Sequence, residues 1–86
     1  MVPNKMLKGK KCELEIKNKY SSIGCKTIPT GKGSDFLALC PNKIPTFVEV
    51  KSCKSNLTPF QRKIRETIVK SGFNYTIERC GCRNLV

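Results

Sequence analysis

The sequence contains no histidine, and its acidic residues are few. Over 86 residues, 17 Lys and Arg stand against six Asp and Glu, giving a formal net charge of +11 at pH 7. Without histidine, the Ser-His and Cys-His pairs of many nucleophilic enzymes are excluded. A structural zinc site is poorly supported too, because no Cys-x-x-Cys spacing occurs. The charge indicates a polyanionic partner, nucleic acid ahead of a membrane surface; the alternative is a soluble protein with a lysine-rich solvated surface.

Long apolar runs are also missing. No stretch approaches the ~20 apolar residues of a membrane span, and the basic N-terminal segment is not followed by the apolar core of a signal peptide. The sequence therefore predicts an intracellular, cytoplasmic protein with no membrane partner. An apolar content of 38% favours a folded chain, and the length suits one small domain.

Cysteines, in contrast, are numerous and widely spread: Cys12, Cys25, Cys40, Cys53, Cys80 and Cys82. For an intracellular chain we expect free, buried thiols, although disulfides are typical of intracellular proteins of hyperthermophiles. If bridges form, the expected strand pairing favours Cys25–Cys40 and Cys53–Cys80. The cysteines leave open a different class of function, a small disulfide-stapled basic protein such as a secreted effector.

The apolar pattern predicts an α/β domain of αβββαβ order. A helix over about 9–22 is expected, and Gly24 is expected to stop it. Its apolar stripe at helical spacing consists of Cys12, Ile16, Tyr20 and Ile23. Short apolar or alternating segments predict four strands, over 25–30, 35–40, 46–52 and 73–78.

The second helix is the best-marked element of the sequence. Thr58 suits the N-cap, Pro59 the first helical position and Gln61 the third, which together form a capping box. Gly72 is expected to end this helix. Its predicted buried face consists of Phe60, Ile64 and Ile68.

Two of the few acids, Asp35 and Glu49, lie on the second and third predicted strands. If these strands close around Lys43, Asp35 lies opposite Lys51 and Leu37 opposite Glu49. The two acids are then diagonal neighbours on one sheet face, about 7–8 Å apart at Cα. Both carboxylates can reach a single cation from there.

Alternation along the third strand places Glu49 and Lys51 on the same side. Two acids and a lysine thus converge at one corner of the sheet. Because unpaired buried carboxylates are costly, a hard divalent metal is their natural counter-charge. The alternative is structural: Asp35 caps a turn, and Glu49 pairs with Lys51 or a neighbouring lysine on an exposed strand.

With Asp35 followed by Glu49-Val50-Lys51 in an αβββαβ order, the sequence resembles the PD-(D/E)XK nuclease superfamily. It is most similar to archaeal Holliday junction resolvases and to short resolvase-like, VRR-type nucleases, through "KGKKCELE" and "FVEVKS" followed by "LTPFQRKIRETIVKSGFNY". The likeness covers about 8–79 of a single domain spanning 1–86. It departs from the superfamily at Ser34, where the motif has proline, and in the segment after the lysine.

The resemblance implies a restriction-endonuclease-like core, a mixed four-stranded sheet flanked by helices. It implies a DNA endonuclease that depends on Mg²⁺ or Mn²⁺, is structure-specific in the manner of Holliday junction resolvases, and serves DNA repair or recombination. The implied catalytic residues are Asp35, Glu49, Lys51, Glu13 and Gln61. The implied metal ligands are Asp35, Glu49, the backbone carbonyl of Val50, and Glu13.

Glu13 and Gln61 each have a simpler explanation. On a helical wheel Glu13 lies about 65° from the centre of the apolar stripe and Glu15 about 95° on the other side, so Glu13 can reach a site at the packed border. It can equally be a surface charge in the first turn of a helix. For Gln61, the capping box is a sufficient role.

The predicted DNA contacts are cations around the site: Lys8, Lys10, Lys11, Lys26 and Lys32. We expect Lys63, Arg65 and Lys70 on the second helix to be merely solvated. A homodimer is expected to present two sites to branched or duplex DNA. The alternative within this fold is a module that binds nucleic acid without cleaving it.

Overall fold

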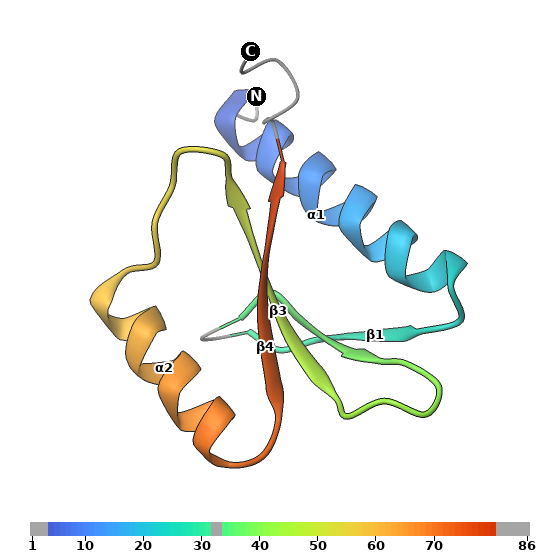
Figure 1. The fold of residues 1–86 in the computed structure, drawn as a ribbon. Coiled ribbons are helices and arrows are strands. Elements are labelled where there is room, and N and C mark those ends of the chain that lie inside the picture. The colour runs from blue at the N-terminus through green and yellow to red at the C-terminus, as the bar shows by residue number, and fades with distance from the viewer. Residues whose placement is uncertain (1–3, 32–33, 81–86) are drawn as a thin grey trace.

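The structure is a computed structural model that describes residues 4–31 and 34–80, without the side chains of 4–10. Its elements are α1 (Asn4–Ser22), β1 (Lys26–Pro29), β2 (Phe36–Leu39), β3 (Thr46–Ser52), α2 (Pro59–Lys70) and β4 (Asn74–Cys80). The predicted αβββαβ order is confirmed (Figure 1). Neither described helix is long and apolar enough to cross a membrane.

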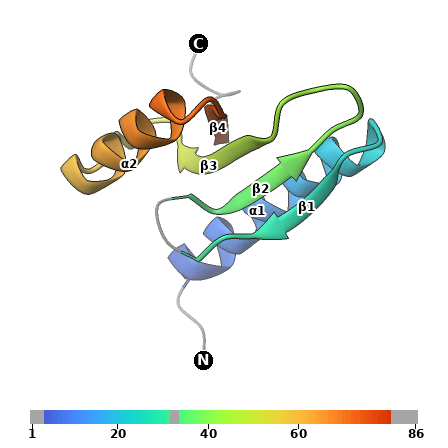
Figure 2. The same ribbon diagram turned by 90° about the horizontal axis from the view of Figure 1, so that it is seen from below.

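The sheet has four strands in the order β1-β2-β3-β4. The first two pairings are antiparallel, whereas β4 runs parallel to β3, with α2 as the crossover between them. The helices α1 and α2 lie on opposite sides of this sheet (Figures 1 and 2). The predicted mixed four-stranded sheet flanked by helices is therefore confirmed.

Helix α1 covers the face of the sheet that holds the core. Ile16 and Tyr20 pack against the fully buried cluster of Phe36, Ala38 and Val48. The helix ends at Ser22, and Gly24 follows with φ +92°, a left-handed conformation that suits glycine. Ile23 lies beyond the helix end and is 64% exposed, so its predicted place in the buried stripe is wrong.

Helix α2 begins as its local sequence predicts. The backbone N–H of Gln61 donates to Thr58 Oγ1 at 3.1 Å, and the backbone N–H of Thr58 donates to Gln61 Oε1 at 3.0 Å. Ile64 and Ile68 are half-buried against the sheet. Phe60 is 58% exposed, which contradicts its predicted burial; on this first turn Gln61 is the half-buried residue instead.

The register of β2 with β3 differs from the expected one by two residues. Phe36 pairs with Val48 and Leu37 with Phe47, so neither Asp35 opposite Lys51 nor Leu37 opposite Glu49 is correct. The cause is the turn, which centres on Asn42 rather than Lys43. Asn42 has φ +58°, a left-handed conformation that Asn tolerates better than most residues.

A slip of two residues leaves every side chain on its predicted face, since side chains alternate with period two. Continued one step beyond Phe36, the observed register places Asp35 opposite Glu49, not diagonal to it. The pairing of the two acids is thus closer than the sequence suggested. One face carries the core under α1, and the other carries Asp35 and Glu49.

The cysteines are bonded, so the expectation of free thiols is wrong for the residues that the structure describes. Cys25 and Cys40, on neighbouring strand ends with Cα atoms 4.1 Å apart, form the predicted bridge. The predicted Cys53–Cys80 bridge is wrong, because Cys80 is bonded to Cys12. Cys80 pairs with Ser52 and shares the sheet face beneath α1, whereas Cys53 lies past the end of β3.

Candidate functional site

Asp35 and Glu49 meet on the sheet face opposite α1. Asp35 directly precedes β2, and its backbone N–H donates to the carbonyl oxygen of Val48 at 2.8 Å. Its side-chain Oδ2 accepts the backbone N–H of Val50 at 2.6 Å, which fixes the carboxylate against β3. Glu49 is only 6% exposed, and its carboxyl group shares a hydrogen bond with that of Asp35. The structure therefore brings the two predicted acids together.

The proximity of these acids changes the proton affinity of Glu49. Burial, followed by the hydrogen bond to Asp35 and the charge of Asp35, raises the Glu49 pKa to about 7. Lys51 acts in the opposite direction and lowers this pKa, while Glu13 raises it. Near neutral pH, and with no cation bound, the pair therefore holds a proton for part of the time.

Lys51 and the backbone of Val50 adjoin the acid pair. Lys51 is half-buried on β3, on the same face as Glu49, and forms no ion pair with another described residue. The N–H of Val50 points toward Asp35, and in an extended strand the carbonyl of a residue points to the same edge as its N–H. The Val50 carbonyl is therefore directed to the edge of β3 that Asp35 occupies.

Glu13 lies near the acids but has another partner. Its Oε2 is 3.1 Å from Lys17 Nζ, an ion pair one turn apart on α1. Its charge nevertheless reaches Glu49, whose pKa it raises. In the described part of the chain, no three acidic or other ligating side chains come close enough to hold a metal ion together. Glu13 thus belongs to the surroundings of the acid pair.

None of the remaining predicted residues has a contact with the acid pair among those that the described residues show: they have another role, are exposed, or lie outside the described residues. The Gln61 side chain accepts the N–H of Thr58 in the capping box. Lys11 is exposed on α1. Lys26 is exposed opposite Leu39, about 13 Å along β2 from Asp35. The side chains of Lys8 and Lys10, and all of Lys32, lie outside the described residues.

Tyr75 belongs to the site, and reasoning from the sequence missed it. Tyr75 lies on β4, opposite Phe47 of β3, and therefore shares the sheet face that carries Glu49. Burial, then the charges of Glu49 and Asp35, raise the Tyr75 pKa to about 12, while Arg65 lowers it. The alternation of β4 predicted a half-buried Tyr75; only its parallel register beside β3 shows that the hydroxyl lies within electrostatic reach of the acids.

Arg79 is the second residue that the sequence did not single out. It lies opposite Lys51 in the β3–β4 register. Its Nη1 donates to the backbone carbonyls of Ser52 at 3.0 Å and Cys53 at 3.5 Å, and to that of Ser55. Arg79 thereby holds the turn that follows Lys51.

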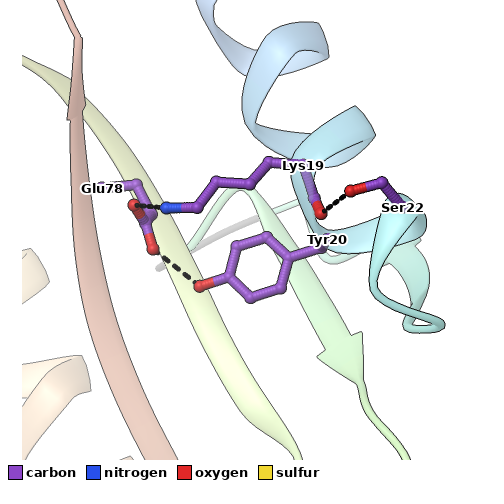
Figure 3. Close-up of polar contacts among 4 residues, drawn as sticks. All are labelled: Lys19, Tyr20, Ser22 and Glu78. Atoms are coloured by element: carbon purple, nitrogen blue, oxygen red, sulfur yellow. Dashed lines mark hydrogen bonds and ion pairs between the residues drawn. The ribbon is translucent and has the colours of Figure 1, made fainter.

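Another carboxylate, that of Glu78, lies on the opposite face of the sheet from Glu49 and has a different environment (Figure 3). Tyr20 donates its hydroxyl to Glu78 Oε2 at 2.7 Å, and Lys19 Nζ is 3.4 Å from Oε1. Burial, then the hydrogen bond to Glu78, raise the Tyr20 pKa well above its usual value. Ser22 Oγ donates to the Lys19 carbonyl at 2.7 Å. Glu78 attaches α1 to β4.

The comparisons with known proteins agree with this geometry. No protein-family model and no curated protein matches the chain in sequence. In structure, the chain is similar to a solved structure described as "VRR_NUC domain", with a TM-score of 0.74 and 24% sequence identity, covering 84% of this chain and 84% of that one. The likeness shows that the chain has the fold of that VRR_NUC domain, and the predicted fold is confirmed.

Proposed function

We propose that this chain is a metal-dependent endonuclease that hydrolyses phosphodiester bonds in DNA. One observation carries the proposal: on a VRR_NUC fold, two carboxyl groups share a hydrogen bond at a largely buried corner of the sheet. A cluster of acids with a strongly perturbed pKa is typical of functional sites.

The donor set fits a hard divalent ion. Mg²⁺ binds oxygen ligands and is usually held by one or two carboxylates, with water and substrate phosphate completing its shell. Asp35 and Glu49 supply two carboxylates, and the Val50 carbonyl faces the same edge. Mg²⁺ or Mn²⁺ would replace the proton that Glu49 holds. Such an ion supplies Lewis acidity, which lowers the pKa of water and neutralises charge on the phosphate.

The residues of the chain divide the remaining work. The Val50 N–H orients the Asp35 carboxylate. Lys51, on the same face and without an ion-pair partner among the described residues, stabilises the negative charge that develops on the phosphate. Glu13, held by Lys17, adds negative potential or accepts a hydrogen bond from water at the border of the site. Gln61 contributes by fixing the start of α2.

The test is a cleavage panel. Four-way junction, flap, single-stranded and duplex DNA are incubated with the protein in Mg²⁺ and in Mn²⁺. We expect Asp35→Asn, Glu49→Gln and Lys51→Gln each to lower the cleavage rate by about 100-fold or more, because each removes a charge at the reacting phosphate. The matched control is Glu15→Gln, an exposed acid on α1. Full activity of Glu49→Gln would overturn the proposal, and binding without cleavage of any substrate would favour the non-catalytic module.

We further propose a homodimer that acts on branched or duplex DNA. Ile28 is 46% exposed, Ile44 53% and Phe73 42%, which leaves apolar surface for a second copy. Two copies present two acid pairs to two strands. Light scattering at assay concentration is expected to give the dimer mass; a fully active monomer would remove the dimer from the mechanism.

The disulfides bear on location and on a second candidate function. Disulfides persist in oxidising compartments, and inside cells mainly in hyperthermophiles. We therefore propose an intracellular location in a hyperthermophilic organism. The bonded cysteines favour, as the second candidate, a secreted disulfide-stapled basic protein. Intact mass of the natively isolated protein, with and without alkylation, separates the bonded from the reduced form, and the cleavage panel separates the two functions.

A further inference from the structure

Helix α2 carries cations along one side. Arg62, Arg65, Glu66 and Val69 follow one another at helical spacing, and with Lys70 they line a surface hollow of about 420 Å³. Arg62, Arg65 and Lys70 are all exposed. We call these three cations the α2 stripe.

The charges of the α2 stripe are not used by the fold. In the described part of the chain, the ion pairs are Lys17–Glu13 and Lys19–Glu78, neither of them on α2. Glu66 lies one turn from both Arg62 and Lys70, yet no ion pair forms with either. The positive charge of the stripe is therefore available to a ligand.

One member of the stripe, Arg65, lies near a residue that the acid pair also affects. Tyr75 shares the sheet face of Glu49, and its pKa responds to Arg65 as well as to Glu49 and Asp35. Arg65 is thus the member of the stripe within electrostatic reach of the same hydroxyl as the acids. Helix α2 lies on the side of the sheet away from α1 (Figure 2). By the strand register, the acids face that same side.

We propose that Arg62, Arg65 and Lys70 bind the sugar–phosphate backbone of the nucleic-acid strand that leads away from Asp35 and Glu49. This rests on the proposed function in one respect, that nucleic acid is the ligand. Arg62 and Lys70 are about 12 Å apart along the helix axis. Measured along the axis of a DNA duplex, this distance corresponds to about three to four phosphates of one strand. The guanidinium fork of arginine matches the geometry of a phosphate group.

This assignment differs from the one that the sequence suggested. The sequence predicted phosphate contacts from lysines that precede or flank the β1–β2 hairpin. It predicted that the cations of α2 are solvated and bind no ligand. Lys26, however, is at the far end of β2 from Asp35. The backbone of α2, in contrast, is fixed at its start by the capping box, so the stripe is presented on a rigid element.

The experiment measures binding, separately from cleavage. In a Glu49→Gln background without divalent metal, fluorescence anisotropy gives Kd for a duplex oligonucleotide at several salt concentrations. We expect Arg62→Gln/Arg65→Gln to raise Kd about tenfold or more and to reduce the slope of log affinity against log salt by about 1.8, the value for two lost phosphate contacts.

The matched control is Lys43→Gln/Lys54→Gln, which removes the same charge from exposed positions outside α2, on the β2–β3 turn and on the turn after β3. If both double variants have the same Kd and the same slope of log affinity against log salt, the proposal that the α2 stripe binds nucleic acid is overturned. The single variant Lys70→Gln provides a second reading, with an expected slope change of about 0.9. Unchanged thermal unfolding shows that each variant is folded.

The outcomes separate the stripe from the endonuclease. If the wild type cleaves DNA but the Arg62→Gln/Arg65→Gln variant binds DNA like its control, binding by the α2 stripe is refuted and the proposed endonuclease activity is supported. If the wild type binds without cleaving and this variant loses affinity, the stripe stands and the nuclease falls. A wild type that binds no nucleic acid refutes both.

Discussion

Glu49 and Glu78 are glutamates on the two adjacent parallel strands, and they face opposite sides of the sheet. Both are largely buried: Glu49 is 6% exposed, and the Glu78 side chain 20%. Their surroundings differ. Glu78 receives the hydroxyl of Tyr20 and lies beside the ammonium of Lys19, whereas the neighbour of Glu49 is a second carboxyl group, that of Asp35.

The difference separates an acid that holds the fold together from the acid that we propose to be functional. A buried carboxylate is tolerated when donors and cations replace the water it has lost. Glu78 has such partners, and it joins α1 to the sheet. Glu49 forms no ion pair with another described residue and shares its hydrogen bond with a second acid, and the charge of Lys51 offsets this only in part. Its charged form is therefore disfavoured in the isolated protein, and a bound cation would stabilise it. Each prediction below changes one side of this contrast.

The largest expected effects come from exchanging each glutamate for glutamine. Glu49→Gln is expected to lower DNA cleavage by about 100-fold or more while leaving stability without metal unchanged or higher, because a like-charge contact is removed. Glu78→Gln is expected to lower the free energy of unfolding by about 1–3 kcal/mol while cleavage stays near the wild-type rate. Cleavage assays measure the rate, and urea unfolding measures the stability of each variant. A Glu78→Gln variant that is as stable as the wild type but does not cleave DNA would contradict the contrast between the two glutamates.

The Cys12–Cys80 bridge ties α1 to the end of β4, on the side of Glu78. Replacing both cysteines by serine is expected to lower the free energy of unfolding by about 2–4 kcal/mol, since the bridge closes a long loop. Thermal unfolding under non-reducing conditions measures the loss. The Glu49 pKa should stay raised, because its largest causes, burial and Asp35, lie on the other face, and only the smallest contribution comes from Glu13 beside Cys12. A fall of the Glu49 pKa to its usual value, measured by NMR, would contradict this separation.

The pH dependence of stability should identify Glu49. Its folded pKa, about 7, exceeds the unfolded value of 4.5, so the native state binds more protons between these two values. The contribution of this group to stability without metal is therefore largest below about pH 4.5, and it falls by about 3 kcal/mol as the pH rises from there through 7.

Glu49→Gln is expected to flatten that dependence between pH 5 and 8, while Glu78→Gln leaves its slope unchanged. Mg²⁺ should raise the unfolding temperature more at pH 8 than at pH 6, because it competes with the proton for the same acids. A wild-type stability that rises from pH 5 to 8 without metal would contradict the assigned pKa.

The smallest expected effect concerns the partner of Glu78. Tyr20→Phe removes the hydroxyl that donates to Glu78 and keeps the ring against Phe36, whose centroid is 5.8 Å away. The expected loss is about 0.5–1.5 kcal/mol, the value of one hydrogen bond. Urea unfolding measures it, and cleavage is expected to be unaffected. If Tyr20→Phe lowers the cleavage rate although the protein remains folded, the two faces of the sheet are energetically coupled, which would contradict the contrast.

The sequence predicted the features that depend on local chemistry. The α2 cap follows from Thr58, Pro59 and Gln61, which meet within one turn. The shared face of Asp35 and Glu49 follows from strand alternation, and it survived a wrong register because the error was two residues. That error came from one left-handed residue, Asn42, which composition alone does not place at the centre of a turn.

What the sequence did not predict depends on how distant elements cross. Tyr75 reaches the acids, and Arg79 the turn after Lys51, only through the parallel pairing of β4 with β3. The Cys12–Cys80 bridge needs the N-terminal half of α1 to lie over the end of β4. Neither helical spacing nor strand alternation contains that information, since both describe one element at a time.

The sequence distance between partners suggests an order of folding. The contact between Asp35 and Val50 spans 15 residues, whereas those of Glu78 with Tyr20 and Lys19 span 58 and 59. Short loops close at a lower entropic cost than long ones. We therefore expect the β2–β3 hairpin to form before α1 docks, with the Val50 amide protected from hydrogen exchange ahead of the β4 amides. A nascent chain would then carry the acidic corner before it has β4, the strand whose Glu78 holds α1.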